Sequence, residues 1–278
     1  MELLNFRKEI IIDLRDDFPE LVDKFNHFIL KLLPSKKNSV AELIFNKETE
    51  RLPKNIVIKA FKSPNAENEF NTLKNLRKQN ILVPKILFFK NPYLILEKLD
   101  GINLCDFINE KLKNVENLDN LEPIIRKKII KSIEKLAAWL AEFHRNNMAY
   151  KAESSESIVL NKGDTRLRDF IYNESKEIIY GTDFEDSYKG SHLDDIAWIC
   201  CSLLDTNPGI FELNDPRIKI DLLNQFLLEY YQRNPNLKFD FKYFTEHLIE
   251  NLNIVMRRRH INLNLEKSYF IEQISRDI

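Results

Sequence analysis

The sequence predicts an α+β fold, in which a sheet-rich first third is followed by a mainly helical remainder. Five short runs rich in β-branched and aromatic residues predict strands at residues 28–33, 40–45, 55–61, 83–89 and 93–97. Apolar residues at helical spacing predict one helix among these strands, at residues 66–76, and a short one before them, at 17–27. After residue 100 the helical pattern dominates, over residues 104–115, 124–147, 196–204, 220–233, 241–256 and 265–274.

The composition is that of a globular protein large enough for one large domain or two lobes. Of the 278 residues, 44% are hydrophobic and 31% are charged, and a net charge of -1 gives no field that would favour nucleic acid or an anionic membrane. The three cysteines, Cys105, Cys200 and Cys201, lack metal-ligand spacing, so a reducing cytoplasm is the simplest assumption. The N-terminus is too charged for a signal peptide, and no apolar run approaches a membrane span. We expect a cytoplasmic protein without a membrane or nucleic-acid partner, and its oligomeric state stays open.

Three aspartates, Asp164, Asp169 and Asp183, lie in one short stretch of the chain. Two apolar runs, residues 170–172 and 178–180, flank a polar turn between the last two aspartates, which predicts a β-hairpin. Because a hairpin brings its open ends together, Asp169 should lie beside Asp183, with Asp164 on the loop that enters the hairpin. Converging carboxylates need a positive group, and a divalent cation bound to a polyphosphate is the natural candidate.

This stretch resembles the catalytic segment of the protein-kinase-like superfamily, in particular its aminoglycoside and choline phosphotransferase branch. That pattern has Gly-Asp or Arg-Asp, a magnesium-ligating Asn five residues on, and a hairpin that ends in Asp-Phe-Gly or Asp-Phe-Glu. The chain has Gly163-Asp164, Asp169 in place of the Asn, and Asp183-Phe184-Glu185. The Asp-Phe-Glu form points to the small-molecule branch more than to protein kinases.

The resemblance covers roughly residues 28–210 and implies a bilobal fold. It implies an ATP-binding N-lobe, residues 1–97, with a five-stranded antiparallel sheet plus one helix. It also implies a mainly helical C-lobe, residues 98–278, with the catalytic loop and a helical substrate region. The implied activity is transfer of the γ-phosphate of ATP to a hydroxyl of a small molecule, with Mg2+ as the metal.

The resemblance assigns roles to four residues of the catalytic segment. Asp164 is the expected base for the substrate hydroxyl, and Asp169 and Asp183 are the expected magnesium ligands. Arg166 occupies a position close to the γ-phosphate, so it should offset charge in the transition state.

Lys59 stands inside the apolar run of the third predicted strand, where a charge is rare unless it is paired. The predicted helix at residues 66–76 places Glu69 at the same edge as Lys59. The resemblance implies that Glu69 positions Lys59 on the α- and β-phosphates of ATP. The structural alternative is an edge-strand lysine whose amine reaches solvent.

The remaining nucleotide contacts are expected in two places. Residues 34–39 connect the first two strands, where kinases carry a glycine-rich phosphate loop, but this connection contains no glycine. Phosphate contact there would come from Ser35, Ser39, nearby backbone amides or the two lysines of the connection. After the fifth strand, the backbone of Glu97 and Leu99 is expected to bind adenine.

The chain departs from the family pattern at two positions of the catalytic segment. Asp169 in place of Asn preserves oxygen ligation but adds a negative charge, which should strengthen metal binding and alter the metal count. Lys162 stands where the family usually has His or Tyr.

Four other features have a structural interpretation beside a functional one. His144 and Trp139 are interpreted as packed side chains of a long helix. Asp195 is expected to reach back to the backbone of the catalytic loop, although an acid at a helix N-terminus is also favoured by the helix dipole. The run at residues 257–259, three arginines, is interpreted as a solvated helix end rather than as an anion site.

Two alternatives to a small-molecule kinase stay open. One is a small atypical protein kinase or ATPase that works in a protein or RNA-processing complex. The short interval between Asp183 and Asp195 leaves no room for a conventional activation segment, which excludes only the conventional protein kinases. The other is a non-catalytic protein that binds nucleotide without turning it over.

Overall fold

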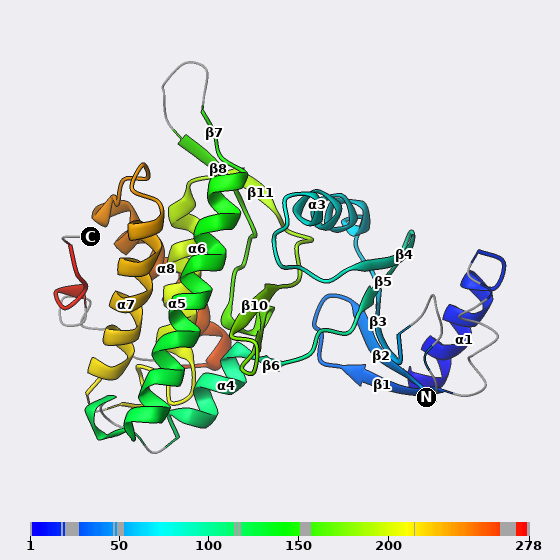
Figure 1. Cartoon of the computed structure of the whole chain (residues 1–278), viewed down its shortest axis with the longest axis horizontal. Helices are drawn as coiled ribbons and strands as arrows, with labels where there is room; N and C mark the ends of the chain where they lie inside the picture. Colours follow the sequence, from blue (N-terminus) through cyan, green and yellow to red (C-terminus); the bar gives the residue numbers. More distant parts are fainter. Residues whose placement is uncertain are drawn as a thin grey trace. The chain divides into compact units, whose positions relative to one another are not determined.

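The structure is a computed structural model that describes residues 2–17, 19, 28–46, 48, 53–113, 115, 118–150, 157–213, 215–261 and 271–276. Its chain divides into two compact units (Figure 1). The first comprises residues 1–77 and 83–99, and the second comprises residues 78–82 and 100–278. Most of the helices predicted at residues 17–27 and 265–274 lies outside the described residues.

The first unit is built on a five-stranded antiparallel sheet with the order β1-β2-β3-β5-β4. The strands are β1 (Phe28–Leu33), β2 (Ser39–Phe45), β3 (Asn55–Ala60), β4 (Ile86–Lys90) and β5 (Tyr93–Glu97). All five agree with the predicted runs to within a few residues, and the predicted fold class is confirmed. Helix α3 (Ala66–Lys78) contributes Phe70, whose ring stacks on that of Phe89 in β4 at a centroid distance of 4.3 Å.

The first unit also contains a helix that the sequence analysis did not predict. Helix α1 (Glu2–Leu14) packs its buried residues Phe6, Ile10 and Leu14 into one cluster with the buried face of the sheet. The sheet residues of this cluster are Ala41, Leu43, Phe45, Ile56, Ile58, Tyr93 and Ile95. The first unit therefore has a hydrophobic core between α1 and the sheet.

The second unit is mainly helical. Its helices are α4 (Leu104–Lys111), α5 (Pro123–Asn146), α6 (His192–Asp205), α7 (Arg217–Arg233) and α8 (Phe241–Arg259). Helix α5 packs against α7, and α6 packs against both α7 and α8. The apolar face of α5 forms part of the core, because its members are fully buried: Ile133, Leu136, Ala137, Leu140 and Phe143.

Two small antiparallel sheets complete the second unit (Figure 1). One consists of β6 (Ile102–Asn103), β9 (Phe170–Asn173) and β10 (Ile178–Gly181), in the order β10-β9-β6. The other consists of β7 (Ala149–Tyr150), β8 (Ser157–Asn161) and β11 (Tyr188–Gly190), in the order β11-β8-β7. The predicted hairpin is β9–β10, with Phe170 opposite Gly181 at its open end.

Within the described ranges, no helix combines the length and the apolar character that crossing a bilayer requires.

Candidate active site

The loop between β8 and β9 carries Asp164, and the buried carboxylate of Asp195 holds this loop in place. Asp195, in the first turn of α6, is 1% exposed. Its Oδ2 accepts the Lys162 backbone N–H at 2.7 Å, and its Oδ1 accepts the Gly163 backbone N–H at 3.2 Å. The Thr165 hydroxyl donates to the same carboxylate. The predicted reach of Asp195 to the loop backbone is confirmed.

His144 also contacts this carboxylate. It is fully buried in α5, with Nε2 3.2 Å from Asp195 Oδ2 and Nδ1 2.7 Å from the Tyr230 hydroxyl. Burial alone would raise the pKa of Asp195, but hydrogen bonds and charge from His144, with further bonds from Thr165 and the loop backbone, bring that pKa below its usual value. The interpretation of His144 as a packed side chain is confirmed, and its contact with Asp195 was not predicted.

Gly163 brings the loop against a second loop, which follows β10. It has φ of +79°, and a Cβ placed there would lie 2.4 Å from the Asp186 carbonyl oxygen. Only glycine fits such a close backbone approach with a left-handed φ. The loop that carries Asp164 is therefore in direct contact with the loop that carries Asp183, within the second unit.

Asp164 itself has a left-handed backbone, with φ of +45°, and its side chain is 37% exposed. Arg166 donates to Asp164 Oδ1 from Nε at 2.8 Å and from Nη2 at 2.5 Å. The guanidinium of Arg166 lies 5.2 Å from the centroid of the Trp198 ring. Arg166 is thus the direct partner of Asp164, an arrangement that the sequence analysis did not foresee.

Asp169 ends the short 3-10 helix η3 (Leu167–Asp169) immediately before β9. Its Oδ2 accepts the Arg166 backbone N–H at 3.1 Å and lies 3.3 Å from the Nζ of Lys162. Burial raises the pKa of Asp169, the charge of Asp183 adds to this effect, and Lys162 opposes it. Asp169 is therefore paired with a lysine, and the charge of a second carboxylate acts on it.

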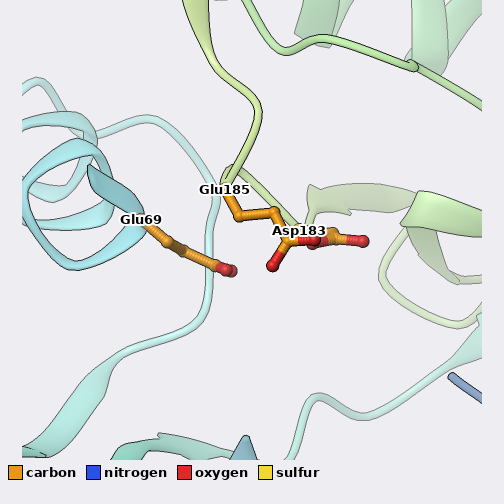
Figure 2. A group of neighbouring side chains, drawn as sticks. All are labelled: Glu69, Asp183 and Glu185. Atoms are coloured by element: carbon orange, nitrogen blue, oxygen red, sulfur yellow. The ribbon is translucent and has the colours of Figure 1, made fainter. Parts of the chain in front are cut away.

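The hairpin fixes Asp183 relative to Asp169. The Thr182 N–H and hydroxyl donate to the Asp169 carbonyl oxygen at 2.8 and 3.0 Å. Asp183 follows with φ of +64°, and Figure 2 shows that it and Glu185 leave the same loop. Glu69, the third side chain labelled in Figure 2, belongs to α3 of the first unit.

The donor set of the Asp183 loop suits a hard divalent cation, because Mg2+ prefers carboxylate and phosphate oxygens. The predicted convergence of three aspartates is only partly seen. In the part of the chain that the structure describes, Asp164 and Asp169 belong to no group of three potential metal ligands whose atoms lie within 4.8 Å of one another. Asp164 is bonded to Arg166, and Asp169 is bonded to Lys162.

In the first unit, Lys59 and Glu69 form the predicted ion pair. Lys59 Nζ lies 2.6 Å from Glu69 Oε2, with both residues buried, at 7% and 1% exposure. The amine also lies 4.6 Å from the centroid of the Phe61 ring. The alternative of a lysine that reaches solvent is wrong, because the charge is desolvated.

The glycine-free connection between β1 and β2 is held by its own polar side chains. The Asn38 N–H donates to Ser35 Oγ at 3.2 Å, and Asn38 Oδ1 accepts the Lys62 N–H at 3.2 Å. Ser39 is the first residue of β2. Contact of Ser35 and Ser39 with phosphate stays a prediction.

The expected adenine contacts begin where β5 ends. The Glu97 N–H donates to the Lys85 carbonyl at 3.0 Å, and the Glu97 carboxylate accepts the Lys85 N–H at 2.8 Å. Because the Glu97 N–H is bonded within the sheet, the candidates for contact with adenine are the Glu97 carbonyl and the backbone of Leu99. Their contact with adenine stays a prediction.

The arginine run ends α8, as interpreted from the sequence. Arg259 lies 2.9 Å from Asp205 Oδ1 and donates to the Asp205 carbonyl at 2.9 Å. Arg257 donates to the Asn253 carbonyl of its own helix at 3.3 Å. Both side chains are therefore engaged at the helix end.

Comparison with known proteins gives one family match and a set of structural neighbours. Residues 34–166, just under half of the chain, match the model of the lipopolysaccharide kinase (Kdo/WaaP) family. This segment includes Lys59, Glu69 and Asp164 but stops before Asp169 and Asp183. No protein with a curated description matches the sequence significantly.

Two solved structures share the fold of the whole chain. A glucosamine kinase is 11% identical, with a TM-score of 0.54 over 96% of this chain and 81% of its own. An amicoumacin kinase, solved in complex with AMP-PNP, Ca2+ and Ami, is 13% identical, with a TM-score of 0.51 over 94% of this chain and 93% of its own. Together with the family match over residues 34–166, the fold shared with these kinases confirms the resemblance that the catalytic segment predicts.

Proposed function

We propose that this protein is an ATP- and Mg2+-dependent phosphotransferase that transfers the γ-phosphate to a hydroxyl of a small molecule. The observation that carries the proposal is the loop at residues 162–169, which Asp195 fixes at two backbone amides so that Asp164 is presented by a rigid support. The kinase family match and the kinase neighbours support the same reaction class. We place the activity in the cytoplasm, where ATP is available and the cysteine thiols stay reduced.

Asp164 accepts or orients the proton of the acceptor hydroxyl. Its Oδ1 is held by two donors of Arg166, so we assign Oδ2 to the hydroxyl. This fork of hydrogen bonds fixes the orientation of the carboxylate. As negative charge develops on the transferred group, the guanidinium of Arg166 offsets part of it.

The metal and the nucleotide have their own residues in this scheme. Asp183 is the carboxylate that we assign to hold Mg2+, which when bound would neutralise charge on the phosphates. Lys59, oriented by Glu69 at 2.6 Å, binds the α- and β-phosphates. The backbone of Glu97 and Leu99 binds adenine. Ser35, on the connection between β1 and β2, and Ser39, at the start of β2, are assigned to the phosphates.

The acceptor class is a hydroxyl-bearing metabolite such as a sugar, an amino alcohol or an aminoglycoside. Glucosamine and lipopolysaccharide sugars, which appear in the descriptions of the matched proteins, are the first compounds to test.

The test is Mg2+-dependent ATP consumption by the wild type and by Asp164→Ala against pooled acceptors. We expect one pool to stimulate the wild type, and we expect Asp164→Ala to lose this stimulation by roughly 10²–10⁴-fold, the usual contribution of a general base. Asp119→Ala is the matched control, because Asp119 is a surface carboxylate with a 71% exposed side chain.

Two results would contradict the proposal. A wild type that binds ATP without turnover in any pool would be a nucleotide-binding scaffold. Slow turnover that no small molecule stimulates would instead indicate a kinase or ATPase that works on a macromolecule.

A further inference from the structure

Lys162 and Asp169 form a buried ion pair that the proposed reaction does not use. Lys162 is 1% exposed, and its Nζ lies 3.3 Å from Asp169 Oδ2. The amine also lies 5.7 Å from the centroid of the Phe184 ring, which belongs to the Asp183 loop. The pair therefore lies beside the loop that carries the carboxylate assigned to the metal, and all of these residues belong to the second unit.

The lysine is fixed at this place by the cost of burying a charge. An ammonium group removed from water needs an opposite charge or several hydrogen bonds, and leaving one partner unpaired is strongly destabilising. Asp169 supplies the opposite charge, and the face of the Phe184 ring adds a weaker attraction. The amine of Lys162 is thus held where a soluble cation would otherwise be attracted by Asp169 and Asp183.

The hydrogen bonds of Asp169 also indicate that it is a partner of Lys162 rather than a metal ligand. A single oxygen, Oδ2, lies within hydrogen-bonding distance of both Lys162 Nζ and the Arg166 backbone N–H. Among the described residues, Asp169 joins no group of three or more potential metal ligands whose atoms lie within 4.8 Å of one another. Its Oδ2 is engaged by two protein donors.

The charges of the three residues decide the effect on a metal. The charges of Lys162 and Asp169 cancel each other, so Asp169 adds no net charge beside the Asp183 loop, as would be the case with neutral residues at both positions. The expectation that Asp169 strengthens metal binding therefore does not follow once Lys162 is its partner.

We propose that Lys162 is a positioning residue whose buried ammonium group holds Asp169 and takes the place of a second metal ion, so that the site binds a single divalent cation through Asp183. This inference rests on the proposed function, because it concerns the metal of that reaction.

The experiment counts bound Mn2+ by the loss of its free electron paramagnetic resonance signal, with AMP-PNP equimolar to the protein. We expect the wild type to bind one Mn2+ per chain, about tenfold more tightly than AMP-PNP alone does, a difference of ~1.4 kcal/mol. Lys162→Met keeps the apolar stem and removes the charge, which frees Asp169. We expect this variant to bind two Mn2+ per chain.

Two further variants identify the ligand. The double variant with Lys162→Met and Asp169→Asn restores a neutral pair, so it should return to one Mn2+ per chain. The single variant Asp183→Asn should bind its Mn2+ about tenfold more weakly than the wild type does. Because Asp169→Asn alone leaves the lysine buried without a partner, the double variant is the informative one. A thermal unfolding transition for each variant verifies that it is folded.

Two Mn2+ per chain in the wild type would overturn this inference alone. One Mn2+ per chain in folded Lys162→Met would also overturn the inference, because the lysine would then not be what excludes the second ion. A wild type that adds nothing to the Mn2+ binding of AMP-PNP would overturn it together with the metal assignment of the proposed function. Failure of acceptor-stimulated turnover, with the Mn2+ counts as expected, would overturn only the proposed reaction.

Discussion

His192 is a buried histidine whose protonation is coupled to the folding of the second unit. It is 6% exposed, and its Nε2 lies 3.0 Å from the Tyr231 hydroxyl. Burial, with a smaller contribution from the charge of His144, lowers the pKa of His192 from 6.5 to about 3. Between these two pKa values the unfolded chain binds a proton that the folded chain does not. Stability from this residue is therefore complete above pH 6.5 and is lost as the pH falls towards 3.

We predict that His192→Gln makes the protein less sensitive to acid. From pH 6 to pH 4 the free energy of unfolding of the wild type should fall more steeply than that of the variant, by up to about 1.4 kcal/mol per pH unit. The amide of glutamine can still bond to the Tyr231 hydroxyl, so the comparison isolates the titration. Urea unfolding at a series of pH values measures both slopes, and parallel curves would show that His192 does not titrate on unfolding.

At the scale of elements, local patterns predicted the hairpin and the long helices because their signals lie within one segment. The two apolar runs around the polar turn predict β9–β10, and the apolar stripe of α5 predicts its buried face. The Lys59–Glu69 pair could also be predicted, because a charge in an apolar strand requires a partner and α3 offers one.

Other elements escaped prediction for identifiable reasons. Helix α1 does carry a helical signal, since Phe6, Ile10 and Leu14 recur every four residues. The signal-peptide criterion depends on the charge of this segment and not on this spacing, so it gives no indication of the helix. The strands β7, β8 and β11 are short, and their pairing depends on tertiary contacts rather than on local alternation.

The side-chain contacts that hold the site in place also depend on tertiary structure rather than on local sequence patterns. His144 and Asp195 are 51 residues apart, and their meeting depends on how α5 packs near α6. The Lys162–Asp169 pair is closer in sequence, yet it requires the lysine to turn inward, and an exposed lysine would have fitted the same pattern. No periodicity in the sequence could separate these two orientations.

The contact between the two loops of the site gives a prediction at this scale. Gly163→Ala would place a methyl group 2.4 Å from the Asp186 carbonyl oxygen at a φ of +79°. Forcing an atom into a packed position costs about 1–3 kcal/mol. Because Asp164 is the next residue, we expect phosphotransferase activity to fall along with the free energy of unfolding.

The matched control for this variant is Gly209→Ala. A Cβ at Gly209 would lie 3.6 Å from its nearest neighbour, which is ordinary contact distance, so stability and activity should be nearly unchanged. Thermal unfolding and turnover of both variants measure the effect. Equal behaviour of the two variants would show that the close approach at Gly163 is not needed.

At the scale of the whole molecule, the proposed function predicts how ligands change stability. A ligand that binds only the native state raises the free energy of unfolding by mass action, by about 2.7 kcal/mol when its concentration is about 100 times its Kd. Mg2+ with AMP-PNP should therefore raise the unfolding temperature of the wild type, and AMP-PNP with a chelator should raise it less.

The variants separate the two contributions to this stabilisation. Lys59→Met removes the cation assigned to the phosphates, so it should lower the stabilisation with and without Mg2+. Asp183→Asn removes the carboxylate assigned to the metal, so it should abolish only the part that depends on Mg2+. Asp119→Ala should respond as the wild type does, because its 71% exposed side chain has no assigned role in binding. A full Mg2+-dependent shift in Asp183→Asn would mean that the metal is held elsewhere, and with it the assignment of the Asp-Phe-Glu loop as the metal site would fail.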